Sequence, residues 1–100
     1  MDETKKPDTA SPEAIHLPEE VRRGVFANQV IISHSPEEFV LDYVFRHSIG
    51  GNVIVSRVIL TPDHAKRLLK ALTENVQIYE RNHGPIKEPT AAPPPPVSRH

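Results

Sequence analysis

The prolines of this 100-residue chain are concentrated at its two ends: nine of the eleven lie outside residues 25–84, and only Pro36 and Pro62 lie inside. Proline fixes φ and removes a backbone donor, so a proline-rich segment cannot continue a helix or a central strand. Residues 25–84 are therefore the stretch in which a core can form. A domain of this size buries only about 60% of the surface that its unfolded chain exposes, and self-association commonly supplies the missing stability.

Both ends are predicted to be disordered. Residues 1–23 are polar, with 6 acidic and 4 basic side chains, and burial in such a segment cannot offset the entropy lost on ordering. Residues 85–100 contain the run Pro93–Pro96, which favours an extended polyproline conformation. With Arg99, this run is also a candidate ligand for an aromatic-lined groove of a partner protein. We expect one domain, residues 24–84, between an acidic arm and a proline-rich tail.

Composition excludes several classes of protein. The chain has no cysteine, which excludes disulfide cross-links, cysteine zinc sites and thiol catalysis. Its 12 basic and 13 acidic side chains give a net charge of −1, so no basic surface dominates as it does in proteins that coat nucleic acid. There is no apolar signal-peptide region at the start, and no stretch approaches the ~20 apolar residues that cross a bilayer. We expect a cytoplasmic protein that does not bind membranes.

Three strands are predicted in the middle of the chain. The first is residues 25–33, and the turn signal Ser35–Glu38, which also has the pattern of a one-turn helix cap, follows it. Residues 39–46 alternate between large apolar and other side chains; a helical spacing also fits them, but their aromatic and β-branched content favours a strand. Glycines 50–51 supply positive φ for a reversal into a third strand, residues 53–60.

A long helix is predicted after the third strand. Thr61 is a capping hydroxyl, Pro62 suits the first helical position, and Asp63 lies at the positive end of the helix dipole. Gly84 and Pro85 mark the end of a helix of about six turns. The fold class is therefore α+β, a three-stranded antiparallel meander followed by one long C-terminal helix. Its apolar stripe consists of Ala65, Leu68, Leu69, Leu72, Val76 and Tyr79.

The proportions of these elements predict homo-oligomerisation. The helix spans about 33 Å and an eight-residue strand about 26 Å, so the last helical turns overhang the sheet. Three strands also leave two open sheet edges. We therefore expect a non-catalytic assembly module, a dimer or a higher oligomer, that has the capacity to bind another protein. The candidate interface residues are Leu68, Ala71, Leu72, Val76, Ile78 and Tyr79.

Two alternative hypotheses concern charged residues. In a β-β-β-α chain the end of the first strand and the start of the helix fall at one pole, where His34, Asp63 and His64 are candidate metal ligands or acid–base groups. Asp63 is already explained as a helix-start residue, which favours a capping role. The second hypothesis is a regulatory anion or nucleic-acid site. Its candidate cations are Arg46, Arg57, Lys66, Arg67 and Lys70.

The simpler interpretation of these cations is a solvated surface. Asp63 lies four residues before Arg67, and Glu74 lies four after Lys70, so the helix neutralises its own charges. We expect Asp42 to form a cross-strand ion pair with Arg57 and a mid-strand asparagine, Asn28, to be hydrogen-bonded at a bulge or edge. No catalytic triad order, phosphate-binding glycine loop or nucleotide fingerprint is present, so we predict neither an enzyme nor a cofactor.

Over residues 25–82 the sequence resembles a family of small prokaryotic proteins that is grouped only as a domain of unknown function. The resemblance supports a self-contained domain and implies no activity, cofactor or catalytic set. The residues that carry it are Ala27-Asn28, Val30, Ile32, Ser35, Glu38-Phe39, Leu41-Asp42-Tyr43, Ser56-Arg57-Val58, Pro62, His64-Ala65-Lys66, Leu68-Leu69, Ala71-Leu72 and Tyr79-Glu80.

Overall fold

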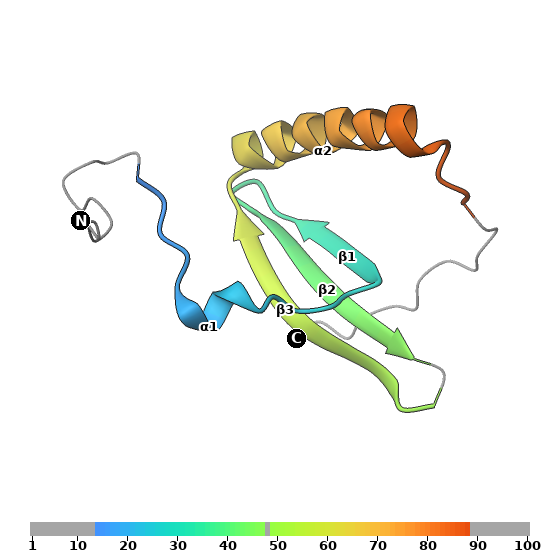
Figure 1. Ribbon diagram of the computed structural model, residues 1–100. Helices are drawn as coiled ribbons and strands as arrows, with labels where there is room; N and C mark the ends of the chain where they lie inside the picture. Colours follow the sequence, from blue (N-terminus) through green and yellow to red (C-terminus); the bar gives the residue numbers. More distant parts are fainter. Residues whose placement is uncertain (1–13, 48, 89–100) are drawn as a thin grey trace, which may run out of the picture.

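The computed structural model describes residues 14–47 and 49–88, which form two helices and one sheet. In chain order the elements are α1 (Glu19–Arg22), β1 (Gln29–His34), β2 (Phe39–His47), β3 (Gly51–Leu60) and α2 (Pro62–His83). The strands pair antiparallel in the order β1-β2-β3, and α2 runs along one side of the sheet (Figure 1). The predicted α+β meander with a long C-terminal helix is confirmed, and the ambiguous segment after residue 38 is a strand.

Alternation along β2 separates its side chains onto two faces of the sheet. Leu41 pairs with Ile32 on β1 and with Val58 on β3, so these three residues form a row across one face. Asp42 pairs with Arg57 on the opposite face. We call the face that carries Leu41 the apolar face. By register its residues are Val30, Ile32, Phe39, Leu41, Tyr43, Phe45, Val53, Val58 and Leu60.

One residue of β3 has no partner on β2. Tyr43 pairs with Ser56, whereas Val44 pairs with Ile54, so Val55 lies between them as a bulge. A bulge bends its strand and increases the local twist. The sequence around Val55 is uniformly favourable for a strand, so no local signal predicted it.

β1 begins later than predicted. Residues 25–28 were expected to be part of the strand and are not, although the Asn28 N–H still donates to the Val44 carbonyl at 3.0 Å. The amide of Asn28 binds the backbone of Arg46, and the Phe26 ring packs edge-on against Phe45 with their centroids 5.5 Å apart. The same contacts confirm that Asn28 is a hydrogen-bonded position.

The turns use the residues that the sequence indicated. Gly51 has a φ of 86° at the β2–β3 reversal, and β3 starts at this residue, two positions earlier than predicted. In the β1–β2 turn, the Ser35 hydroxyl accepts a hydrogen bond from the Glu37 N–H at 3.2 Å. This turn contains no helical residue, so the one-turn helix that its pattern also suggested does not form.

Both ends of α2 lie where the sequence placed them. The Thr61 hydroxyl caps the helix by accepting a hydrogen bond from the His64 N–H at 3.3 Å, and Pro62 is the first helical residue. Gly84, with a φ of 91°, follows the last turn and donates its N–H to the carbonyl of Glu80 at 2.9 Å. Neither α2 nor α1, the helices of the described residues, has the length and apolarity that a membrane span requires.

α1 is a single helical turn inside the segment that was expected to be a disordered arm. It starts directly after Pro18, and Glu19 forms an ion pair with Arg22 at 3.5 Å. An acidic residue in the first turn and a basic one in the last complement the helix dipole, which explains this local structure. Residues 1–13 of the predicted arm and residues 89–100 of the predicted tail lie outside the described residues.

Little of the apolar surface of the described residues is buried. Leu41 and Val44, with 6% and 4% of their surface exposed, are the buried hydrophobic residues, and both lie on the central strand. Ile32 and Val58, which flank Leu41 in its row, remain exposed. The sheet and the helix of one chain therefore do not complete a core.

Candidate interaction surface

The apolar stripe of α2 is shielded only near its start. Ala65 and Leu68, in the first two turns, are partly covered by the rest of the chain. The stripe beyond them is open to solvent. The exposed fractions there are 66% for Leu69, 57% for Leu72, 37% for Val76 and 52% for Tyr79.

The structure places five of the six predicted interface residues in solvent. Leu68 is partly shielded, and the other five are exposed. Leu69, which was not among the candidates, is the most exposed residue of the stripe. Its spacing of three residues before Leu72 was the sequence signal that pointed to it.

The apolar face of the sheet is a second exposed surface. Val30, Ile32, Val53 and Val58 all belong to this face by register, and all four are exposed. Phe39, on the same face, is partly covered. These residues were not predicted to be an interface, although their alternation along the strands was the available signal. We call this face and the α2 stripe together the open apolar surface.

The opposite face of the sheet carries the predicted ion pair. Arg57 donates from Nε to Asp42 Oδ1 at 2.7 Å and from Nη2 to Oδ2 at 3.0 Å, which is the two-pronged geometry of a strong arginine–carboxylate pair. The hydrogen bond that Arg57 donates to Asp42 raises the pKa of Arg57 above its usual value. Asp42 is buried and Arg57 is half exposed. The pair therefore ties β2 to β3, and it engages one of the candidate anion-binding cations.

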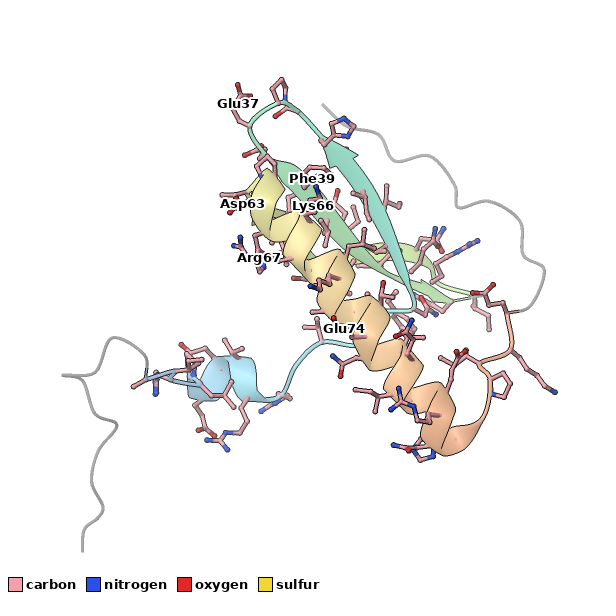
Figure 2. All side chains as sticks on the ribbon, turned by 90° about the horizontal axis from the view of Figure 1, so that it is seen from above. Glu37, Phe39, Asp63, Lys66, Arg67 and Glu74 are labelled. Carbon is pink, nitrogen blue, oxygen red and sulfur yellow. The ribbon has the colours of Figure 1, made fainter. Side chains whose placement is uncertain are left out.

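A second candidate cation is also paired. Arg67 Nη1 donates to Asp63 Oδ2 at 2.9 Å on the first turns of α2 (Figure 2). A hydrogen bond with the Thr61 side chain, followed by the one from Arg67, lowers the pKa of Asp63 to about 2. Asp63 is thus a helix-start residue held in its charged form. This geometry supports the simpler interpretation of a helix that neutralises its own charges.

Arg46 and the start of α2, which carries Lys66, lie at opposite ends of β2. Arg46 pairs with Asn52 near the β2–β3 turn. Lys66 lies in the first turns of α2, which begins just after β3 ends at Leu60. Leu60 pairs with Phe39 at the other end of β2. Seven strand residues separate these ends by about 23 Å. Anion binding by a single patch of all five cations has no geometric support, and binding by Lys66 and Lys70 stays a prediction.

The predicted pole contains His34 and the start of α2. His34 pairs with Phe39 and stacks on its ring with centroids 5.3 Å apart, and Leu60 pairs with Phe39 from the other side. The backbone of His64 and the carboxylate of Asp63 both take part in the helix start. Within residues 14–47 and 49–88, no group of three or more His, Asp or Glu side chains is arranged to hold a metal ion.

Comparison with known proteins places the chain in a family. No curated protein and no solved structure matches the chain. The family model described as "Protein of unknown function (DUF3467)" matches residues 1–88, which is more of the chain than the resemblance in its sequence covered. That resemblance is confirmed, and the chain belongs to the DUF3467 family.

Proposed function

We propose that this protein is a non-catalytic assembly module that functions as a homo-oligomer. The observation that carries the proposal is the open apolar surface, which leaves only Leu41 and Val44 as buried hydrophobic residues among those described. Large exposed apolar patches mark interaction sites in soluble proteins.

The energetics favour association over exposure. Burying one Leu, Val or Ile side chain contributes about 1.5–3 kcal/mol, and a small domain has little other stability to draw on. A second copy of the chain is a suitable partner because it presents the same two exposed elements, a helix stripe and a sheet face. Each copy can therefore cover what the other leaves open.

The test is the mass of the protein in solution. Size-exclusion chromatography with light scattering at micromolar concentration should give a multiple of the chain mass. Leu72→Glu places a charge in the middle of the stripe and should weaken association by at least about 100-fold, because an unpaired charge is costly to bury.

Gln77→Glu is the matched control, since it adds the same charge to the same helix at a position outside the stripe. It should leave the mass unchanged, and circular dichroism should show that both variants keep their helix. A monomeric wild-type protein, or equal effects of the two substitutions, would contradict the proposal.

A further inference from the structure

The four most exposed residues of the stripe are arranged symmetrically along α2. Leu69, Leu72, Val76 and Tyr79 are separated by steps of three, four and three residues, so the pattern reads the same in both directions about Glu74. Steps of three and four are the a and d positions of a coiled-coil heptad repeat. In this repeat Leu69 and Val76 are a positions, and Leu72 and Tyr79 are d positions.

From this symmetry we infer that α2 pairs antiparallel with α2 of a second copy, with a two-fold axis at the level of Glu74. The inference rests on the proposed homo-oligomeric function and specifies its interface. Leu69 then packs against Tyr79 of the second copy, and Leu72 packs against Val76 of the second copy. Every contact occurs twice, as a two-fold interface requires.

Charge complementarity selects the antiparallel direction. Lys66 and Glu80 are both e positions, on the same flank of the stripe and two heptads apart. In an antiparallel pair, e positions face each other, so Lys66 lies opposite Glu80 of the second copy. In a parallel pair, e faces g, and the g positions here are Leu68, Asn75 and Asn82, which offer no charge partner.

Neither Lys66 nor Glu80 forms an ion pair within the described part of the chain. Glu80 Oε2 accepts a hydrogen bond from the Ile86 N–H at 2.9 Å, which restrains the carboxylate near the C-terminal end of α2. Lys66 projects from the first turns of α2 (Figure 2). Surface ion pairs add little stability, but at e and g positions they set orientation.

Spin-label distances test the orientation directly, because the chain has no native cysteine to remove. Single substitutions Arg67→Cys, Glu74→Cys and Arg81→Cys place a nitroxide at three heptad-spaced positions on the face of α2 away from the stripe. Pulsed electron paramagnetic resonance should give the shortest distance between labels at position 74. The distances at 67 and 81 should be longer and similar to each other, because each pair is offset by 14 residues, or about 21 Å along the axis.

Three other outcomes would overturn the inference. Equal distances at all three positions would indicate parallel helices, and a dimer without a short distance at position 74 would indicate a different interface. Either result leaves the proposed assembly function standing. A labelled protein that is monomeric by light scattering removes both proposals together.

A charge exchange provides an independent test that does not depend on labels. Lys66→Glu should weaken the dimer about 3- to 10-fold, since it places two carboxylates opposite each other. Adding Glu80→Lys in the same chain should restore the wild-type dissociation constant. Failure of the second substitution to rescue the first would show that the two residues do not meet.

Discussion

At the residue scale, the Asn28 side chain takes the place of a strand residue. Its Oδ1 accepts a hydrogen bond from the Arg46 N–H at 2.9 Å, and its Nδ2 donates to the Arg46 carbonyl at 3.1 Å. The amide therefore satisfies both backbone groups of Arg46, as a peptide unit of a neighbouring strand would. β1 begins at the next residue, so this clamp fixes where pairing between β1 and β2 starts.

Asn28→Ala should destabilise the domain by about 1–2 kcal/mol, because two hydrogen bonds worth about 0.5–1.5 kcal/mol each are lost at an exposed site. Urea unfolding followed by circular dichroism measures the difference. Asn52→Ala is the control, since it removes an amide at the position that pairs with Arg46 from β3. Similar losses for the two variants would show that the clamp contributes nothing specific.

The sequence predicted the residue pairs that depend only on alternation and neighbouring strands. Asp42 and Arg57 are an example: both lie mid-strand on consecutive antiparallel strands, and they meet across the sheet. The position of Val55 could not be predicted, because a bulge depends on how two strands fit together and not on local preference.

At the element scale, the helix was the most predictable part of the chain. Capping, proline position, dipole charge and the final glycine all act within a few residues, so Thr61–Asp63 and Gly84 identified both ends. The first strand was less predictable. Its start depends on Phe26 and Asn28 contacting residues that lie far along the chain, and no local pattern records such contacts.

The candidate surface was likewise predictable only where local patterns determine it. Helical spacing identified most of the α2 stripe, because side chains three and four residues apart must share a face. The exposure of the sheet's apolar face was not predicted, since alternation shows which residues share a face but not whether another element covers it.

The stability of the fold should depend on pH through Asp63, at the start of α2. The pKa of Asp63 is lowered from 3.8 to about 2 by its hydrogen bonds with Thr61 and Arg67. A group with a depressed folded-state pKa stabilises the fold above its unfolded pKa, and this contribution is lost as the pH falls through the folded value. The contribution of Asp63 should therefore be complete above about pH 5 and should be lost progressively as the pH falls toward about pH 2.

Comparison with Asp63→Asn isolates this contribution from other titrating groups. The difference in unfolding free energy between wild type and variant should be constant from pH 7 to about pH 5 and should shrink below about pH 4. Urea denaturation at a series of pH values measures it. A difference that does not change with pH would show that the Asp63 interactions are absent in solution.

At the scale of the whole molecule, the sheet and the helix of one chain do not complete a hydrophobic core. The central strand is covered by its neighbours, whereas the open apolar surface faces solvent over both the sheet and α2. In the proposed homo-oligomer, tertiary and quaternary structure would contribute to the same core. Folding and association are then expected to be linked.

This linkage predicts a melting temperature that depends on protein concentration. If the folded state is a dimer and the unfolded state is not, each tenfold increase in concentration should raise the midpoint by on the order of 5 °C. Scanning calorimetry between 5 and 500 µM would measure the shift. A midpoint independent of concentration would mean that single chains are stable alone.

The Val55 bulge has a consequence for the exposed edge of the sheet. The outer edge of β3 is ten residues long, rich in branched side chains, and unpaired within the described residues. A straight edge of this kind is a template on which identical strands can stack without limit. The extra residue interrupts the regular spacing of backbone donors and acceptors halfway along the edge. Growth by strand addition is therefore hindered, and in the proposed homo-oligomer assembly through the helix can stop at a closed, countable number of copies.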